Sequence, residues 1–144
     1  MSAARRAQID ERMRATFAAL ADVLIPEAAG MPAASQVDVQ GKWLDRVLQA
    51  RPDILEPLTR ILTQAGDQEP SDHVRRLQQE DPVGFGALAL AASGGYYMNP
   101  KIRKLIGYPG QKANPPYPDE AEYYLRDGLL DPVIARGPIY RPAP

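Results

Sequence analysis

Hydrophobic residues near the N-terminus recur at the spacing of a helix face. They stand three or four positions apart: Ile9, Met13, Phe17, Leu20 and Leu24. Charged residues fill the positions between them, which is the pattern of an amphipathic helix with one face against a core. The pattern predicts a helix over residues 3–25, and Pro26 should end it because proline cannot continue a helix.

Three more periodic segments follow, and they predict helices over 36–50, 53–65 and 71–79. Because proline is tolerated only in the first turn of a helix, Pro57 should place the regular start of the second of these near Glu56. Ser71 is the predicted N-cap of the third. The loops between them contain Gly and Pro, which favour turns.

Asp81-Pro82 predicts a sharp helix start, with aspartate as N-cap and proline at the first helical position. The helix over 82–97 is rich in Gly and Ala and is apolar all round. Such a helix is usually buried, and its small residues let neighbouring backbones approach closely. We therefore predict that it is the central helix of the molecule.

The remaining third of the chain is less periodic. Asn99-Pro100 predicts a short helix to Ile106, and Gly107-Tyr-Pro-Gly110 predicts a tight turn. We expect residues 111–117 to be extended, 119–125 to be one helical segment, and 131–144 to be irregular. The predicted fold class is all-α: a compact bundle of about five or six helices over residues 1–106, with an irregular Pro/Tyr-rich arm over 107–144.

The arm also differs in composition. All seven tyrosines follow residue 95, and nine of the fifteen prolines lie from Pro100 onward. Tyrosine combines an apolar face with a polar tip and is enriched at protein interfaces. The predicted partner interface comprises Tyr96, Tyr97, Tyr108, Pro109, Tyr117, Tyr123, Tyr124 and Tyr140. The alternative is that these rings pack on the chain's own helices.

Composition and charge exclude several functions. The chain has no cysteine, so it has no disulfide and no thiolate ligand. The formal charge is −1 and the charges look evenly spread, which disfavours nucleic acid as a partner in spite of basic pairs such as Arg75-Arg76. Arg5-Arg6 lacks the apolar stretch of an export signal, and Val83 to Met98 is too short and glycine-rich to cross a bilayer. We expect a soluble chain without membrane insertion.

Candidate chemistry is sparse, and we predict no catalytic, cofactor-binding or metal-binding residue in this chain. The single histidine, His73, has no clustered carboxylates and should have a surface or capping role. Asp119, Glu120 and Glu122 could bind a cation or serve acid–base work, but acids also favour a helix N-terminus. No Gly-rich phosphate loop or nucleophile elbow is present.

Two sequence blocks resemble a known family. Phe17-Ala-Ala-Leu-Ala-Asp-Val-Leu-Ile-Pro26 is similar to the opening F-x-x-L-x-D-x-L-I-P helix of the gluconate 2-dehydrogenase small-subunit (subunit 3) family. Gly94-Gly-Tyr-Tyr-Met-Asn-Pro100, followed by Ile106-Gly-Tyr-Pro-Gly-Gln111, resembles its later glycine–aromatic segment and I-G-Y-P-G turn. The blocks and the helices between them cover most of residues 15–112, and nothing after 112 matches.

The resemblance implies an accessory subunit without catalytic residues of its own. Family members partner a large FAD-dependent dehydrogenase of the glucose–methanol–choline class, often with a cytochrome c, and assist its folding, solubility or export. Many carry a twin-arginine signal, which this chain lacks, so the complex stays in the cytoplasm or the large subunit carries the signal. The cytoplasm is favoured over periplasmic co-export.

Two other classes remain open. The chain could be a free-standing helical interaction or DNA-binding regulatory module, or a small enzyme acting through Asp119, Glu122 and nearby tyrosines.

Overall fold

The computed structural model describes residues 9–113 and 126–139. Throughout these ranges the regular elements are helices, apart from an isolated bridge between Ala28 and Met31, which confirms the all-α class. The chain divides into two compact units, residues 1–110 and 111–144. The predicted boundary at residue 106 lies inside the first unit, because the Tyr108 amide still donates a 2.8 Å bond to the Arg103 carbonyl.

Helix α1 spans Glu11–Leu24 and begins where a side chain caps it. Asp10 is the N-cap, and its carboxylate accepts a 2.8 Å hydrogen bond from the Met13 amide. Ile9 and Asp10 therefore precede the helix, although the periodicity placed them inside it. The predicted end before Pro26 is confirmed, with Ile25 as the C-cap.

The single helix predicted over 36–50 is wrong, because three short elements replace it. They are the 3₁₀ turn η1 (Ser35–Val37), the π-helical turn η2 (Val39–Trp43) and the α-helix α2 (Leu44–Ala50). Asp38 adopts a left-handed conformation with φ of 58°, and Gly41 is non-helical with φ −90° and ψ −128°. Aspartate tolerates the left-handed region better than most residues, and that conformation cannot continue a right-handed helix.

The next two α-helices lie close to where they were predicted. A 3₁₀ turn, η3 (Pro52–Ile54), leads into α3 (Leu55–Ala65), which places Pro57 in the first turn as expected. Helix α4 spans Pro70–Glu80 with Glu69 as N-cap. Ser71 is therefore inside the helix and is not its cap, because Pro70 already occupies the first helical position.

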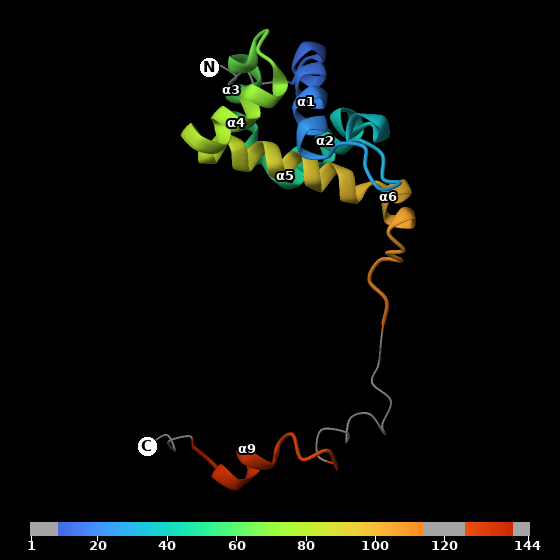
Figure 1. Cartoon of the computed structure of the whole chain (residues 1–144), viewed down its shortest axis with the longest axis vertical. Coiled ribbons are helices and arrows are strands. Elements are labelled where there is room, and N and C mark those ends of the chain that lie inside the picture. The colour runs from blue at the N-terminus through green and yellow to red at the C-terminus, as the bar shows by residue number, and fades with distance from the viewer. Residues whose placement is uncertain (1–8, 114–125, 140–144) are drawn as a thin grey trace, which may run out of the picture. The chain divides into compact units, whose positions relative to one another are not determined.

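Helix α5 (Pro82–Met98) is central, as its composition predicted. It contacts α1, α2, α3, α4, η2 and α6 (Pro100–Leu105), and Figure 1 shows it running along one side of the bundle. Asp81 caps α5 through the Gly84 amide at 3.0 Å, and Asn99 caps α6 through the Lys101 amide at 2.9 Å. Both predicted helix starts are confirmed.

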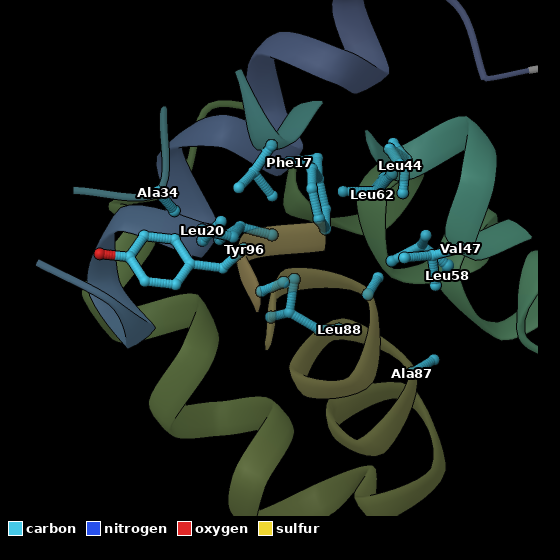
Figure 2. Packing of buried hydrophobic residues seen from close by; sticks show 14 of the residues in the cluster. Phe17, Leu20, Ala34, Leu44, Val47, Leu58, Leu62, Ala87, Leu88 and Tyr96 are labelled. Carbon is cyan, nitrogen blue, oxygen red and sulfur yellow. The ribbon is translucent and has the colours of Figure 1, made fainter. Parts of the chain in front are cut away.

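One hydrophobic core holds the bundle together. Phe17, Leu20, Leu44, Leu58 and Leu88 are fully buried in it. Figure 2 shows these side chains gathered with the ring of Tyr96, whose hydroxyl oxygen points away from the cluster. Gly94 and Gly95 of α5 let the backbone of α2 and η2 approach, since Val47 and Val39 lie within 3.3 Å of where a β-carbon would stand.

The second unit contains one described helix, α9 (Asp131–Arg136), which ends before Gly137 with φ of 69°. The expectation that 131–144 is irregular is thus wrong for these six residues. The helix predicted over 119–125 and the end of the extended segment over 111–117 lie outside the described residues. No helix in residues 9–113 or 126–139 is both long and apolar enough to cross a membrane.

Candidate partner interface

Tyr96 is a core residue of the bundle. Its side chain is 2% exposed, and its hydroxyl donates a 2.7 Å hydrogen bond to the backbone carbonyl of Pro32. Burial, with a smaller contribution from neighbouring Tyr97, raises the pKa of the phenol. We therefore remove Tyr96 from the predicted interface, because its ring is not accessible to a partner.

Tyr97, Tyr108 and Pro109 lie on the surface of the first unit. Tyr97 is 56% exposed and packs edge-to-face on Tyr96, with ring centroids 5.4 Å apart. Tyr108 is 46% exposed, and the guanidinium of Arg103 lies 5.4 Å from the centre of its ring. The four remaining predicted residues, Tyr117, Tyr123, Tyr124 and Tyr140, lie outside the described residues.

The segment that carries Tyr108 is held in a defined position. Ile102 is fully buried and anchors α6, and the Asn99 side-chain amide donates a 2.9 Å bond to the Val37 carbonyl. After α6 the Gly107 and Tyr108 amides bond back to the carbonyls of Lys104 and Arg103, at 3.1 and 2.8 Å. With Gly107 at φ of 70°, this is a Schellman cap, so the predicted turn at Gly107 is the end of a helix.

Around this cap the surface is partly hollow and partly apolar. A hollow of about 430 Å³ is lined by Pro100, Arg103, Lys104, Gly107, Tyr108 and Pro109. Leu105 and Ile106, which follow Lys104 in the chain, are half-exposed. These two residues were not among the predicted interface residues, although they lie directly before the Gly-Tyr-Pro-Gly segment.

The sequence around α6 carries charge of one sign. From residue 82 to residue 118 the sequence contains no Asp or Glu, but it contains Lys101, Arg103, Lys104 and Lys112. The expectation of evenly spread charge therefore fails here. Lys101 and Lys104 are exposed, and neither makes an ion pair within the described part of the chain.

The second unit exposes a run of large apolar side chains. Leu129, Val133, Ile134 and Ile139 are each more than half exposed, and α9 has no buried residue. An exposed apolar patch on a free protein commonly marks an interaction site. None of these residues was predicted to lie at an interface, and Val133, Ile134 and Ile139 belong to the segment 131–144 that was expected to be irregular.

His73 does not have the predicted surface or capping role. Its side chain is 3% exposed, and Nε2 donates a 3.2 Å hydrogen bond to the Ile61 carbonyl, while Nδ1 has no hydrogen-bond partner in the described part. A hollow of about 270 Å³ between α3 and α4 includes His73, Gln64 and Glu80 in its lining. Among the described residues no three His, Asp or Glu side chains come together as a metal site.

The ion pair between Arg60 and Asp81 has a structural role. Arg60 donates to both carboxylate oxygens of Asp81, at 2.5 and 3.3 Å, while Asp81 also caps α5. The hydrogen bond from Arg60, followed by that from the Gly84 amide, holds the pKa of Asp81 below its ordinary value. The acidic residues 119, 120 and 122 lie outside the described residues.

No protein-family model, curated protein or solved structure matches this chain.

Proposed function

We propose that this chain is the non-catalytic small subunit of a heteromeric FAD-dependent alcohol or sugar dehydrogenase, and that it stabilises the large flavoprotein subunit. The proposal joins the resemblance of residues 15–112 to the gluconate 2-dehydrogenase small-subunit family with the surfaces described above. FAD belongs to the large subunit, and a cytochrome c is a candidate third component. The complex is proposed to remain in the cytoplasm.

The observation that carries the proposal is the apolar surface of residues 129–139. Burying one Leu, Ile or Val side chain contributes about 1.5–3 kcal/mol relative to leaving it exposed. Leu129, Val133, Ile134 and Ile139, which their own unit leaves exposed, are therefore a large source of binding free energy. An accessory subunit that functions only in a complex would have such a surface.

The limited chemistry of the bundle agrees with a non-catalytic role. His73, the chain's one histidine, is buried, and its Nε2 donates to the backbone carbonyl of Ile61. Asp81 is engaged by Arg60 and by the cap of α5. Both His73 and Asp81 therefore have a structural role in the bundle.

The second candidate is a free-standing helical module that binds nucleic acid. The acid-free stretch over 82–118 with its four basic residues is the observation that favours it. The overall charge of −1 opposes it. Retention on heparin that falls steeply with salt would support this candidate.

Affinity purification of the tagged chain from its native cells tests the proposal. We expect a yellow eluate in which a much larger protein accompanies the chain, with dehydrogenase activity that the chain alone lacks. A colourless eluate with this chain alone would contradict it, because the apolar surfaces would then have no partner.

A further inference from the structure

We propose that the α6 surface, defined as Tyr97, Lys101, Lys104, Leu105, Ile106 and Tyr108, binds an apolar patch bordered by carboxylates on a partner protein. The identity of that partner as a flavoprotein rests on the proposed function. The chemistry of the contact does not, because it follows from the exposed side chains of this chain.

The apolar component of the surface is large for so short a segment. Tyr97, Leu105, Ile106 and Tyr108 are each about half exposed within twelve consecutive residues, 97–108. Tyrosine is enriched in the cores of protein interfaces, where its ring is buried and its hydroxyl finds a hydrogen-bond partner. The hollow of about 430 Å³ beside Tyr108 could accept a protruding side chain of the partner.

The charged side chains of this surface determine which charge the partner's surface should carry. Lys101 and Lys104 have no acidic partner in the described residues, and Arg103 lies over the Tyr108 ring without an ion pair. One carboxylate, Glu27, shares a hollow with Lys101 and Leu105, but no ion pair joins it to Lys101 among the described residues, and its hydrogen-bond donor is Gln36, at 2.6 Å. Complementary charges at the edge of an interface steer association and select the correct partner.

The surface is also ordered before binding. Ile102 fixes α6 in the core, Asn99 bonds to the Val37 carbonyl, and the Schellman cap fixes Gly107 and Tyr108. A preformed surface loses less conformational freedom on binding, so more of the contact free energy appears as affinity.

The mixture of side chains favours a protein over nucleic acid. The exposed side chains of Leu105 and Ile106 can gain nothing from a phosphate backbone, which is bound mainly by Lys, Arg and polar groups. An apolar patch on a protein would bury them. Carboxylates at the edge of that patch would pair with Lys101 and Lys104.

The test compares two charge reversals in the full tagged chain, each of which changes the net charge by the same amount. Lys101→Glu/Lys104→Glu reverses the α6 surface, and Arg75→Glu/Arg76→Glu reverses two exposed residues of α4 as the control. Both are purified from native cells, and the recovery of the co-purifying protein is measured. We expect the first to lower recovery about ten-fold and the second to leave it unchanged, since only contacting charges contribute strongly to affinity.

A carbodiimide, which joins an amine to a carboxylate as an amide, tests the contact directly. With the wild-type complex we expect cross-links from Lys101 or Lys104 to Asp or Glu of the partner. Equal recovery with both variants, nucleic acid in place of a protein, or a chain that retains no protein would each overturn the inference. A colourless partner that is lost only with Lys101→Glu/Lys104→Glu would support it while refuting the flavoprotein proposal.

Discussion

At the scale of single residues, Tyr96 shows how this bundle joins distant parts of the chain. Its ring is buried among side chains of the core cluster, and its hydroxyl reaches the Pro32 carbonyl in the loop before η1. Asn99 makes a similar bond to Val37. These two contacts tie the irregular segment after α1 to the C-terminal end of α5.

Replacing Tyr96 tests the ring and the hydroxyl separately. Tyr96→Phe keeps the ring but leaves the Pro32 carbonyl without its donor, so we expect a loss of about 1 kcal/mol in the free energy of unfolding. Tyr96→Ala also leaves a cavity and should cost about 3–5 kcal/mol. Urea denaturation followed by circular dichroism measures both, and equal losses would show that the ring contributes nothing beyond the hydroxyl.

Gly95 should be intolerant of a side chain because of the close approach of η2. A β-carbon there would stand 3.3 Å from Val39 Cγ1 and 3.4 Å from Trp43 Cβ. Gly95→Ala should therefore destabilise by about 1–3 kcal/mol, less the gain in helix propensity. At Gly86 a β-carbon meets nothing within 4 Å, so Gly86→Ala in the same helix should stabilise by about 0.5–1 kcal/mol. Thermal unfolding of the two variants compares them, and a stabilising Gly95→Ala would contradict the packing described here.

The sequence could predict only in part which side chains of a helix face the core. In an all-apolar helix the pattern cannot tell which of Tyr96 and Tyr97 faces the core, because no polar face marks the outside. The burial of His73 could have been predicted, because His73 and Leu77 are four residues apart and therefore lie on the same face of α4.

At the scale of elements, three of the described helices begin with an Asp or Asn followed by proline: α5 after Asp81, α6 after Asn99, and α9 at Asp131-Pro132. The first two were predicted from this signal. The third has the same signal, but there the aspartate is not the cap. Asp131 is the first residue of α9, Pro132 is the second, and Leu130 is the N-cap. The break at Asp38 could not be predicted in this way, because nothing in the apolar spacing of 36–50 indicates a left-handed residue.

The Asp81 cap should make the stability of the bundle pH-dependent. The hydrogen bond from Arg60, followed by that from Gly84, lowers the folded-state pKa of Asp81 below its unfolded value of about 4. The stabilisation is thus fully present above the unfolded pKa and is lost as the pH falls through the folded pKa.

Asp81→Asn should remove this dependence while retaining a capping oxygen. We expect the variant to be less stable than the wild type at neutral pH and the difference to shrink on acidification. Urea denaturation at a series of pH values measures the difference. A gap that is constant with pH would show that ionisation of Asp81 does not stabilise the fold.

At the scale of the whole molecule, the chain combines a bundle with a complete core and a second unit whose described helix buries nothing. The all-α class and the central helix were predictable, because periodicity and small residues report directly on packing. Most of the proposed interface was not, because an exposed apolar side chain acquires its role only from a partner. Two linked contacts, the α6 surface and residues 129–139, would each strengthen the other by raising its effective concentration.

Removal of residues 112–144 tests most directly whether the bundle folds without the second unit and whether partner binding needs that unit. Because the core lies within residues 9–102, the shortened chain should keep the helical circular dichroism and the unfolding temperature of the bundle. It should no longer co-purify with the large partner, because the loss of one of two linked contacts removes the gain from linkage. A shortened chain that folds and still recovers the partner in full would contradict the account, and binding would then belong to the bundle alone.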